Sequence, residues 1–256
     1  MNEIIKHEKE SHRFSRLELL LGEDRLKALK ESTVMVLGLG GVGSSCAEAL
    51  ARGGIGHLIL IDKDTVDITN INRQALAFTS TIGRVKAEVM AEMVREINPD
   101  CRVTADQVEL DRDRTPDQLA GYPRPDYVID CIDLVLTKAQ VAYWCQGEGI
   151  PLLASMGAGN KLDPEYLHFD DIMNTRNCPL SKVMRREYRK LGIDHQEVLY
   201  SNQAPVNIKD PLSPDRSHTL GTMSYMPPIV GQMLAGKVLR RLAGLEGSFD
   251  NLSKRR

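Results

Sequence analysis

Blocks of apolar and polar positions alternate along the chain through residue 155. Short, nearly continuous apolar runs occupy residues 33–37, 57–61, 126–129 and 151–155. Between them, residues 43–52, 84–97 and 137–148 carry apolar side chains every three to four positions. The first pattern is typical of buried strands and the second of helices. This alternation predicts an α/β fold of Rossmann type, with a mostly parallel sheet and helices on both faces.

Beyond residue 155 the pattern changes to a mixed β/α part. A strand is expected at 166–169, a helix at 180–191, a strand at 198–201 and a last helix after a loop rich in Pro and Asp. The sequence contains no repeats, and 256 residues can form one large domain, so we expect one domain over residues 1–256. Its parts are a helical N-terminal arm (1–32), a nucleotide-binding core (33–155) and the mixed C-terminal part (156–256).

Composition narrows the classes of protein that the chain can belong to. A net charge of −2 gives no global attraction to nucleic acid or to membranes, so a polyanion would need a local basic patch. The five cysteines are scattered, which argues against a disulfide framework or a zinc site and favours the reducing cytoplasm. The N-terminus is too polar for a secretory signal. Pro227 and Pro228 interrupt the late apolar stretch, so no stable membrane contact is expected.

A glycine-rich turn follows the first strand and leads directly into a helix. Its glycines are Gly38, Gly40, Gly41 and Gly43. Such a turn lets phosphates approach backbone N–H groups at a helix N-terminus. Asp62 ends the second strand, where a carboxylate can accept hydrogen bonds from ribose hydroxyls. The pattern predicts a nucleotide site; a turn that only packs helix on strand would leave Asp62 unexplained.

The loop after Asp62 bears on which nucleotide binds. Arg73 and Lys86 supply two cations for a triphosphate, which a redox dinucleotide would need less. Asp130 and Asp133 follow a later strand and could hold Mg²⁺ together with phosphate oxygens. Each of these residues also has a structural alternative: a surface ion pair, a solvated helix position or a helix cap. Their convergence at strand ends favours ATP and Mg²⁺, with a nicotinamide oxidoreductase as an alternative.

With these motifs assembled, the chain resembles the adenylating family of ubiquitin-activating enzymes and of the molybdopterin and thiamin activators, the ThiF-type enzymes. The motifs are the glycine turn, Asp62-Lys-Asp64, Asn70-Ile-Asn-Arg73-Gln74, Lys86 and Asp130-Cys-Ile-Asp133. The resemblance implies that the glycine turn, Asp62, Asp64, Asn70, Gln74 and Asp133 bind ATP, that Arg73 and Lys86 hold its phosphates, and that Asp130 binds the metal. It also implies a homodimer in which Arg16, within Arg13-Phe-Ser-Arg16, reaches the other subunit's nucleotide as a further catalytic residue.

Within this family the chain is most similar to the tRNA threonylcarbamoyladenosine dehydratases. Specific parts of the resemblance are residues 47–56, 155–164 and the helix after Cys178-Pro179. The resemblance implies ATP-dependent closure of a threonylcarbamoyl group, next to the anticodon of tRNA, into a ring. The C-terminal part would then serve substrate binding and dimerisation, and a cysteine desulfurase or sulfur-acceptor system is a conceivable partner. An activator of a small ubiquitin-like protein is the alternative, although the chain has no Cys-x-x-Cys pairs for that group's zinc and Cys178 has no obvious base.

The helix at 180–191 contains the local basic patch that the overall charge requires. Its basic residues recur at helical spacing: Lys182, Arg185, Arg186, Arg189 and Lys190. A row of cations about one turn apart can follow a phosphate backbone without distinguishing bases. A solvated helix face is the alternative, and the resemblance favours RNA.

Overall fold

The computed structural model describes residues 11–208 and 220–246, which build one seven-stranded sheet. Its strand order is β3-β2-β1-β4-β5-β7-β6, and all neighbours are parallel except β6 and β7. The strands are β1 (Thr33–Leu37), β2 (His57–Asp62), β3 (Arg102–Gln107), β4 (Tyr127–Asp130), β5 (Leu152–Ser155), β6 (Leu167–Asp171) and β7 (Glu197–Ser201). The mostly parallel α/β sheet predicted from the sequence is confirmed.

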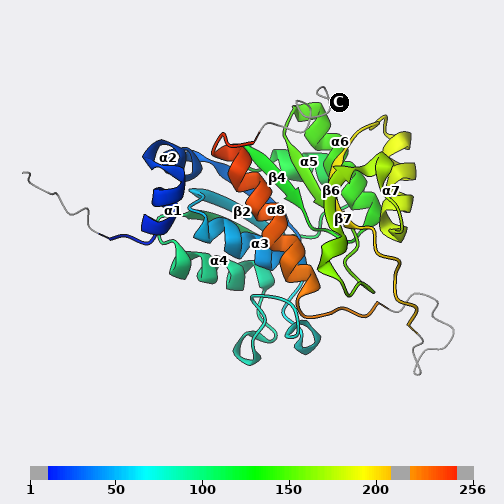
Figure 1. The fold of residues 1–256 in the computed structure, drawn as a ribbon, viewed down its shortest axis with the longest axis horizontal. Helices are drawn as coiled ribbons and strands as arrows, with labels where there is room; N and C mark the ends of the chain where they lie inside the picture. The colour runs from blue at the N-terminus through cyan, green and yellow to red at the C-terminus, as the bar shows by residue number, and fades with distance from the viewer. Residues whose placement is uncertain (1–10, 209–219, 247–256) are drawn as a thin grey trace, which may run out of the picture.

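Helices cover both faces of this sheet (Figure 1). One face carries α3 (Gly41–Arg52), α4 (Lys86–Ile97) and α8 (Met226–Leu242), and the other carries α5 (Thr115–Ala120), α6 (Val135–Glu148) and α7 (Pro179–Lys190). Single-turn 3-10 helices lie at Ile68–Asn70, Thr79–Thr81, Pro164–Tyr166 and Ile172–Asn174.

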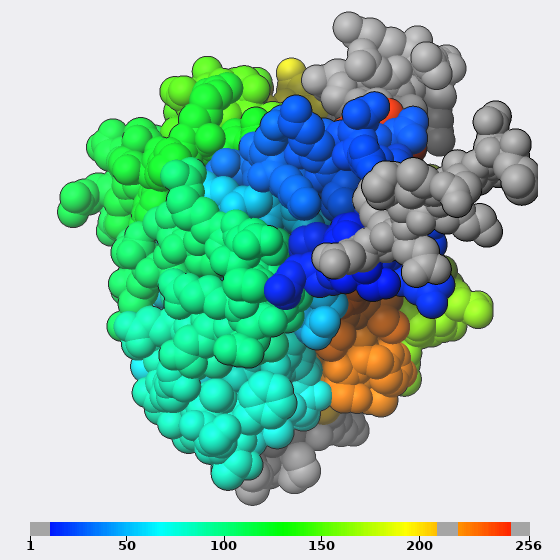
Figure 2. All heavy atoms as spheres, turned by 90° about the vertical axis from the view of Figure 1, so that its left-hand side faces the viewer, coloured from blue at the N-terminus to red at the C-terminus, as the bar shows by residue number. Residues whose placement is uncertain are grey.

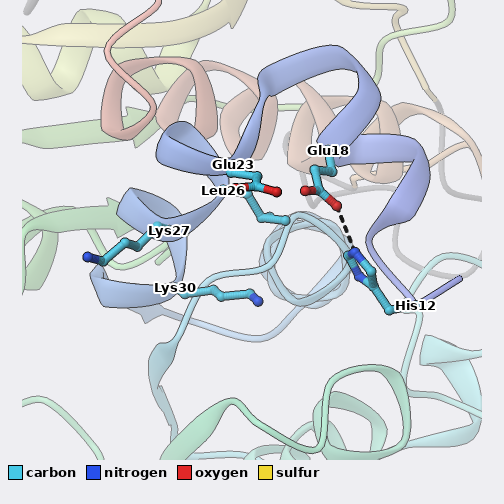
Figure 3. A pocket seen from close by; sticks show the side chains of 6 residues that line it. All are labelled: His12, Glu18, Glu23, Leu26, Lys27 and Lys30. Atoms are coloured by element: carbon cyan, nitrogen blue, oxygen red, sulfur yellow. Dashed lines mark hydrogen bonds and ion pairs between the residues drawn. The ribbon is translucent and has the colours of Figure 1, made fainter. Parts of the chain in front are cut away.

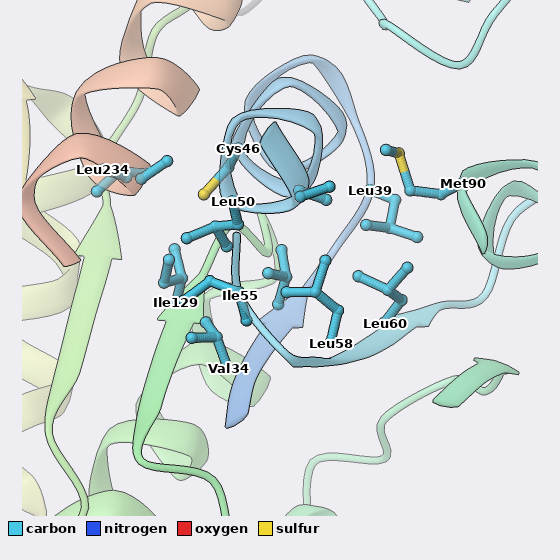
Figure 4. Packing of buried hydrophobic residues seen from close by; sticks show 14 of the residues in the cluster. Val34, Leu39, Cys46, Leu50, Ile55, Leu58, Leu60, Met90, Ile129 and Leu234 are labelled. Atoms are coloured by element: carbon cyan, nitrogen blue, oxygen red, sulfur yellow. The ribbon is translucent and has the colours of Figure 1, made fainter. Parts of the chain in front are cut away.

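Two hydrophobic cores result, one on each side of the sheet. Along β1, Val34 and Val36 enter the first core, while Met35 and Leu37 enter the second. The strand is therefore apolar throughout, because both of its faces are buried. In Figure 4, side chains from three strands lie beneath Leu50 of α3, with Leu234 of α8 beside them.

Several elements differ from the pattern-based expectation. β3 and α5 were missed: β3 is a polar edge strand, and α5 has only six residues. Pro227 and Pro228 do not interrupt the last helix but lie in its first turn. Backbone N–H groups in the first turn have no acceptor within the helix, so the missing N–H of proline costs no hydrogen bond there. Within the described residues, no helix is long and apolar enough to cross a membrane.

The described part of the N-terminal segment forms two helices, α1 (Ser15–Leu21) and α2 (Glu23–Glu31), fixed to the body. Phe14 is buried, and Arg13 Nη1 donates to Ile97 O at 2.8 Å. Figure 2 shows the residues of α1 and α2 on the surface beside those of α4. Residues 11–31 form a fixed surface at the amino ends of the strands, where Gly56 N donates to Leu29 O just before β2.

Candidate nucleotide-binding site

The carboxyl ends of β1, β2 and β4 bring the predicted acids to one edge of the sheet. Leu37, the last residue of β1, pairs with Ile61 on one side and with Asp130 on the other. Asp62 and Asp130 therefore flank the point where the chain enters the glycine turn. The chain order also reverses at β1, since β2 lies to one side and β4 to the other. Open α/β sheets bind ligands at such a switch point.

The glycines of the turn have different roles. Gly38 has φ +82°, and a Cβ there would lie 3.0 Å from Cys131 O. A Cβ at Gly43 would meet Gly38 O at 1.7 Å, and one at Gly41 would meet Pro227 Cβ at 2.7 Å. At Gly40 the nearest atom would be Gln74 Nε2, 4.0 Å away. Three glycines thus permit close packing, while Gly40 leaves space on the side that Gln74 faces.

Asp62 connects the second strand to the glycine turn. Its Oδ2 accepts from Leu39 N at 2.5 Å and its Oδ1 from Asp64 N at 2.8 Å. Burial raises the pKa of this carboxyl, and the two N–H donors and Lys86 oppose that shift. A carboxylate oxygen can accept more than one hydrogen bond, so Asp62 can brace the turn and still bind a ribose hydroxyl.

The loop after β2 places further candidates beside the turn. The stem of Arg73 packs on Gly41, and its Nη1 donates to Thr69 O and Asn72 Oδ1, both at 2.9 Å. Gln74 is only 6% exposed, and its Oε1 has no hydrogen-bond partner within the described structure. An orphaned amide oxygen at this position fits a site that a polar ligand completes. Asn70 instead shapes the loop, because its Oδ1 accepts from Asp67 N at 3.0 Å.

Lys86 is held at the start of α4 by an acidic neighbour. Its Nζ lies 3.1 Å from Asp64 Oδ2, and its side chain is buried while that of Asp64 is half-exposed. The ammonium is therefore kept at the nucleotide edge, with one carboxylate as its anionic partner in the described residues. A phosphate group could replace that carboxylate, because Lys binds either anion as a point charge.

Asp130 is less accessible than the sequence predicted. It is wholly buried, its Oδ1 accepts from Ile132 N at 2.9 Å, and its Oδ2 forms an ion pair of 3.0 Å with Lys138 Nζ. Burial raises the pKa of Asp130, and Lys138 partly offsets the shift. Asp133 lies exposed on the following loop. Sequence analysis missed Lys138; the available signal was a lysine among the apolar positions of the helix.

The donor set fits a magnesium ion only together with a nucleotide. Within residues 11–208 and 220–246, no group of three or more His, Cys, Asp or Glu side chains could hold a metal. Asp130 Oδ2 has an ion pair but no aligned hydrogen bond, so one acceptor position is available there. One or two carboxylates plus phosphate oxygens suit Mg²⁺, which keeps much of its water shell.

Arg16 lies away from its own nucleotide edge. Its helix α1 packs near the amino ends of the strands, whereas Asp62 and Asp130 lie at the carboxyl ends. Its side chain is exposed, unlike that of Phe14 two residues earlier. Arg16 is therefore not brought together with the other predicted catalytic residues within one chain.

A cavity of about 300 Å³ lies between α1 and α2 (Figure 3). Because these helices lie at the amino ends of the strands, the cavity is on the opposite side from the nucleotide edge. His12 Nε2 lies 2.8 Å from Glu18 Oε2 at its wall, and Lys27 and Lys30 lie across from them. This mixture of charges contacts none of the predicted nucleotide ligands. The cavity is therefore distinct from the candidate site.

The basic helix forms as predicted, but its five cations are not equivalent. Arg185 donates to Ile172 O, Thr175 O and Thr175 Oγ1, and so closes a 3-10 turn. Arg186 and Lys190 both pair with Glu187, at 3.2 and 2.8 Å. Lys182 and Arg189 are exposed, and Arg189 approaches only Met173 Sδ. Lys182 and Arg189 are thus the cations of this helix that a polyanion could contact most readily.

Comparison with known proteins finds similarity over nearly the whole chain. Residues 14–254 match the ThiF family. A tRNA threonylcarbamoyladenosine dehydratase of Bacillus subtilis is 39% identical over 242 residues, covering 90% of this chain and 94% of that protein. The Escherichia coli enzyme of that name in complex with AMP has 33% identity and a TM-score of 0.82, covering 91% and 94%. Its complex with ATP has 34% identity and a TM-score of 0.78, covering 92% and 96%.

Proposed function

The chain belongs to the ThiF family, and from its similarity to named dehydratases we propose that it is an ATP-dependent tRNA threonylcarbamoyladenosine dehydratase. The observation that carries the proposal is the match to a dehydratase over 94% of that enzyme's length, and the strand-end acids Asp62 and Asp130 beside the glycine turn support it. Its substrate would be tRNA that carries threonylcarbamoyladenosine next to the anticodon. Such a substrate implies a cytoplasmic reaction.

The proposed chemistry has two steps. A carboxylate oxygen of the threonylcarbamoyl group attacks the α-phosphorus of ATP, and pyrophosphate leaves with the cleaved bond's electrons. A nitrogen of the same group then attacks the acyl carbon, loses its proton and displaces AMP. The net change is the loss of one water from the substrate, driven by the conversion of ATP to AMP and pyrophosphate, which take up the elements of that water. The second step needs no cysteine nucleophile, because holding both ends in one molecule supplies much of the rate.

Different residues at the sheet edge would bind different parts of ATP. The turn at Gly40 and the first N–H groups of α3 would take the phosphates, and Gln74 faces the same space. Arg73 and Lys86 would balance the charge that develops on the phosphates. Asp62 would accept from the ribose, while Asn70 keeps the loop in shape. Asp64 would orient Lys86 until a phosphate arrives.

Magnesium would be held by Asp130, with Asp133 nearby on the same loop and the rest of the shell from phosphate and water. When bound, the ion would neutralise negative charge on the phosphates. Lys138 keeps the Asp130 carboxylate at the strand end, because its Nζ also donates to Asp130 O at 3.1 Å and to Ile132 O at 3.3 Å.

A homodimer would bring Arg16 to the nucleotide of the second subunit. Arg16 is exposed on a helix that cannot serve its own site, and Leu19 and Leu20 beside it are about 80% exposed. The loop after β2 also exposes Ile68 and Phe78. Apolar surfaces of this kind mark interaction sites. Their burial between two copies would bring α1 of one subunit toward the nucleotide loop of the other.

Transfer RNA would bind across α7, chiefly through Lys182 and Arg189. Cysteine chemistry has no evident role, since Cys46, Cys101, Cys145 and Cys178 are buried and Cys131 is half-buried. A sulfur-transfer partner, if one binds, would not use a thiol exposed on this chain.

Pyrophosphate exchange tests the function against its rival, the activation of a ubiquitin-like protein. The protein should exchange labelled pyrophosphate into ATP when tRNA with threonylcarbamoyladenosine is added. The same tRNA without that modification should have no effect, because it offers no carboxylate. Exchange stimulated only by a small protein with a C-terminal glycine would overturn the proposal.

A further inference from the structure

Tyr225 lies between the two loops that border the nucleotide edge. Its hydroxyl donates to Leu162 O at 2.6 Å, in the segment after β5. On the other side, Thr222 O accepts from Asn72 Nδ2 at 3.2 Å, in the loop after β2. Pro227 packs on Gly41 of the glycine turn. Residues 222–227 therefore bridge the two loops; in Figure 1 this segment leads into the orange end of α8.

Tyr225 is exposed although its hydroxyl is hydrogen-bonded to the chain. The residue is 39% exposed although its hydroxyl, the part that water solvates best, is bonded to the chain. The side chain of Tyr225 is therefore anchored at the surface through its hydroxyl. In the segment after β5 that accepts this hydrogen bond, Leu162 and Tyr166 are also exposed, at 47% and 45%. An oriented but uncovered aromatic ring is suited to stacking against a flat ligand.

The segment after β5 joins this ring to the basic helix. At one end of that segment, a Cβ at Gly157 would lie 3.7 Å from Leu180 Cβ in the first turn of α7. At its other end, Leu162 holds Tyr225. Between them, Asn160 bonds Gly221 in both directions, which fixes the bridge to the segment. The segment after β5 therefore connects the first turn of α7 to Tyr225, so an RNA strand that follows this segment would meet the ring.

We propose that the Tyr225 ring stacks against a purine base in the single-stranded RNA loop that carries the carboxylate to be activated. This inference rests on the proposed function. The carboxylate belongs to a group attached to a base, so that base must approach the same edge as ATP. Proteins commonly hold unpaired RNA bases against aromatic rings, and α7 would supply the phosphate contacts that a ring lacks.

Two variants separate the ring from its hydroxyl. Tyr225→Phe keeps the ring and should leave the KM for tRNA within about twofold of wild type. Tyr225→Leu removes the ring and should raise that KM about tenfold to a hundredfold, the usual effect of losing one base stack. ATP affinity should stay constant in both. An equal loss in the two variants would overturn the proposal, because it would assign the effect to the bond with Leu162. So would an unchanged KM in Tyr225→Leu.

A fluorescence titration tests stacking without turnover. Trp144 is the only tryptophan of the chain and is buried, so Tyr225→Trp adds an exposed reporter ring at the proposed site. An RNA hairpin with the anticodon-loop sequence should quench its emission saturably. Tyr143→Trp, placed on α6 where Tyr143 is 50% exposed, is the matched control and should not respond. Equal quenching in both, or none in Tyr225→Trp, would contradict the proposal.

These outcomes also distinguish the inference from the function beneath it. A wild-type protein that leaves threonylcarbamoyladenosine unchanged in tRNA would contradict the proposed function. Quenching of Tyr225→Trp by the hairpin would still support base stacking in that case. Quenching by a glycine-terminated ubiquitin-like protein instead of RNA would overturn both.

Discussion

Lys138 Nζ lies 3.0 Å from Asp130 Oδ2, and neither side chain reaches solvent. The ammonium also donates to the carbonyls of Asp130 and Ile132, so one lysine fixes both the carboxylate and the strand-end loop. That loop in turn packs on Gly38, where a Cβ would meet Cys131 O at 3.0 Å. The nucleotide edge is thus supported from beneath by a buried ion pair.

Breaking this pair should destabilise the protein, whichever partner is replaced. Asp130→Asn leaves a buried ammonium without its counterion, and Lys138→Met leaves a buried carboxylate; each should cost about 3–5 kcal/mol. The double variant should recover most of the loss, because no buried charge remains. Urea unfolding of the four proteins gives the coupling free energy. Simple additivity of the two losses would show that the residues do not interact.

Alanine at neighbouring glycines should separate folding from nucleotide binding. Gly41→Ala would place a methyl group 2.7 Å from Pro227 and should lower the free energy of unfolding by about 1–3 kcal/mol. Gly40→Ala points into open space and should leave stability nearly unchanged while weakening ATP binding. Calorimetric ATP titrations and thermal unfolding measure the two effects. Normal ATP affinity in Gly40→Ala would place the phosphates elsewhere.

Activity should be shared between subunits if Arg16 acts across a dimer. Arg16→Ala and Arg73→Ala should each be inactive alone. After complete exchange in a 1:1 mixture, half of the dimers are mixed, and each mixed dimer has one intact site, so about one quarter of wild-type activity should return. The measurement is pyrophosphate exchange, with subunit mixing verified by mass. No recovery after full mixing would rule out a role in trans.

The salt dependence of tRNA binding should distinguish the exposed cations of α7, Lys182 and Arg189, from Arg185, which holds the 3-10 turn. Replacing Lys182 and Arg189 by alanine should weaken tRNA binding and reduce the slope of log K against log salt by about 1.5, roughly 0.7–0.9 for each lost phosphate contact. Arg185→Ala is the matched control. It should lower stability, because the guanidinium no longer donates to Ile172 O, Thr175 O and Thr175 Oγ1, and should change the slope much less. The reverse order of slopes would locate the RNA contacts on the Arg185 side.

Much of the fold could be predicted because burial on both faces makes central strands continuously apolar. β1 is the clearest example, and its register then places Asp62 and Asp130 at one edge. β3 was missed for the same physical reason: an edge strand with partial exposure can be polar, and Arg102–Gln107 carries no apolar run.

The candidate residues were predictable as types but not in their surroundings. The pattern after each strand indicated Asp62 and Asp130 correctly as strand-end acids, yet nothing in the sequence placed Lys138 against Asp130, because that contact depends on how α6 packs. The even row of cations on α7 likewise concealed that Arg185 points inward to the 3-10 turn. Neighbours brought by tertiary packing decide which charges are available to a ligand.

The proposed reaction is an ATP-driven loss of one water from a modified nucleoside, and mass spectrometry of tRNA nucleosides measures it directly. After incubation of modified tRNA with protein, ATP and Mg²⁺, threonylcarbamoyladenosine should fall as a species lighter by one water rises, with one AMP formed for each ring closed. Gly40→Ala should slow both together. An unchanged nucleoside alongside AMP release, or ring closure without ATP, would contradict the account.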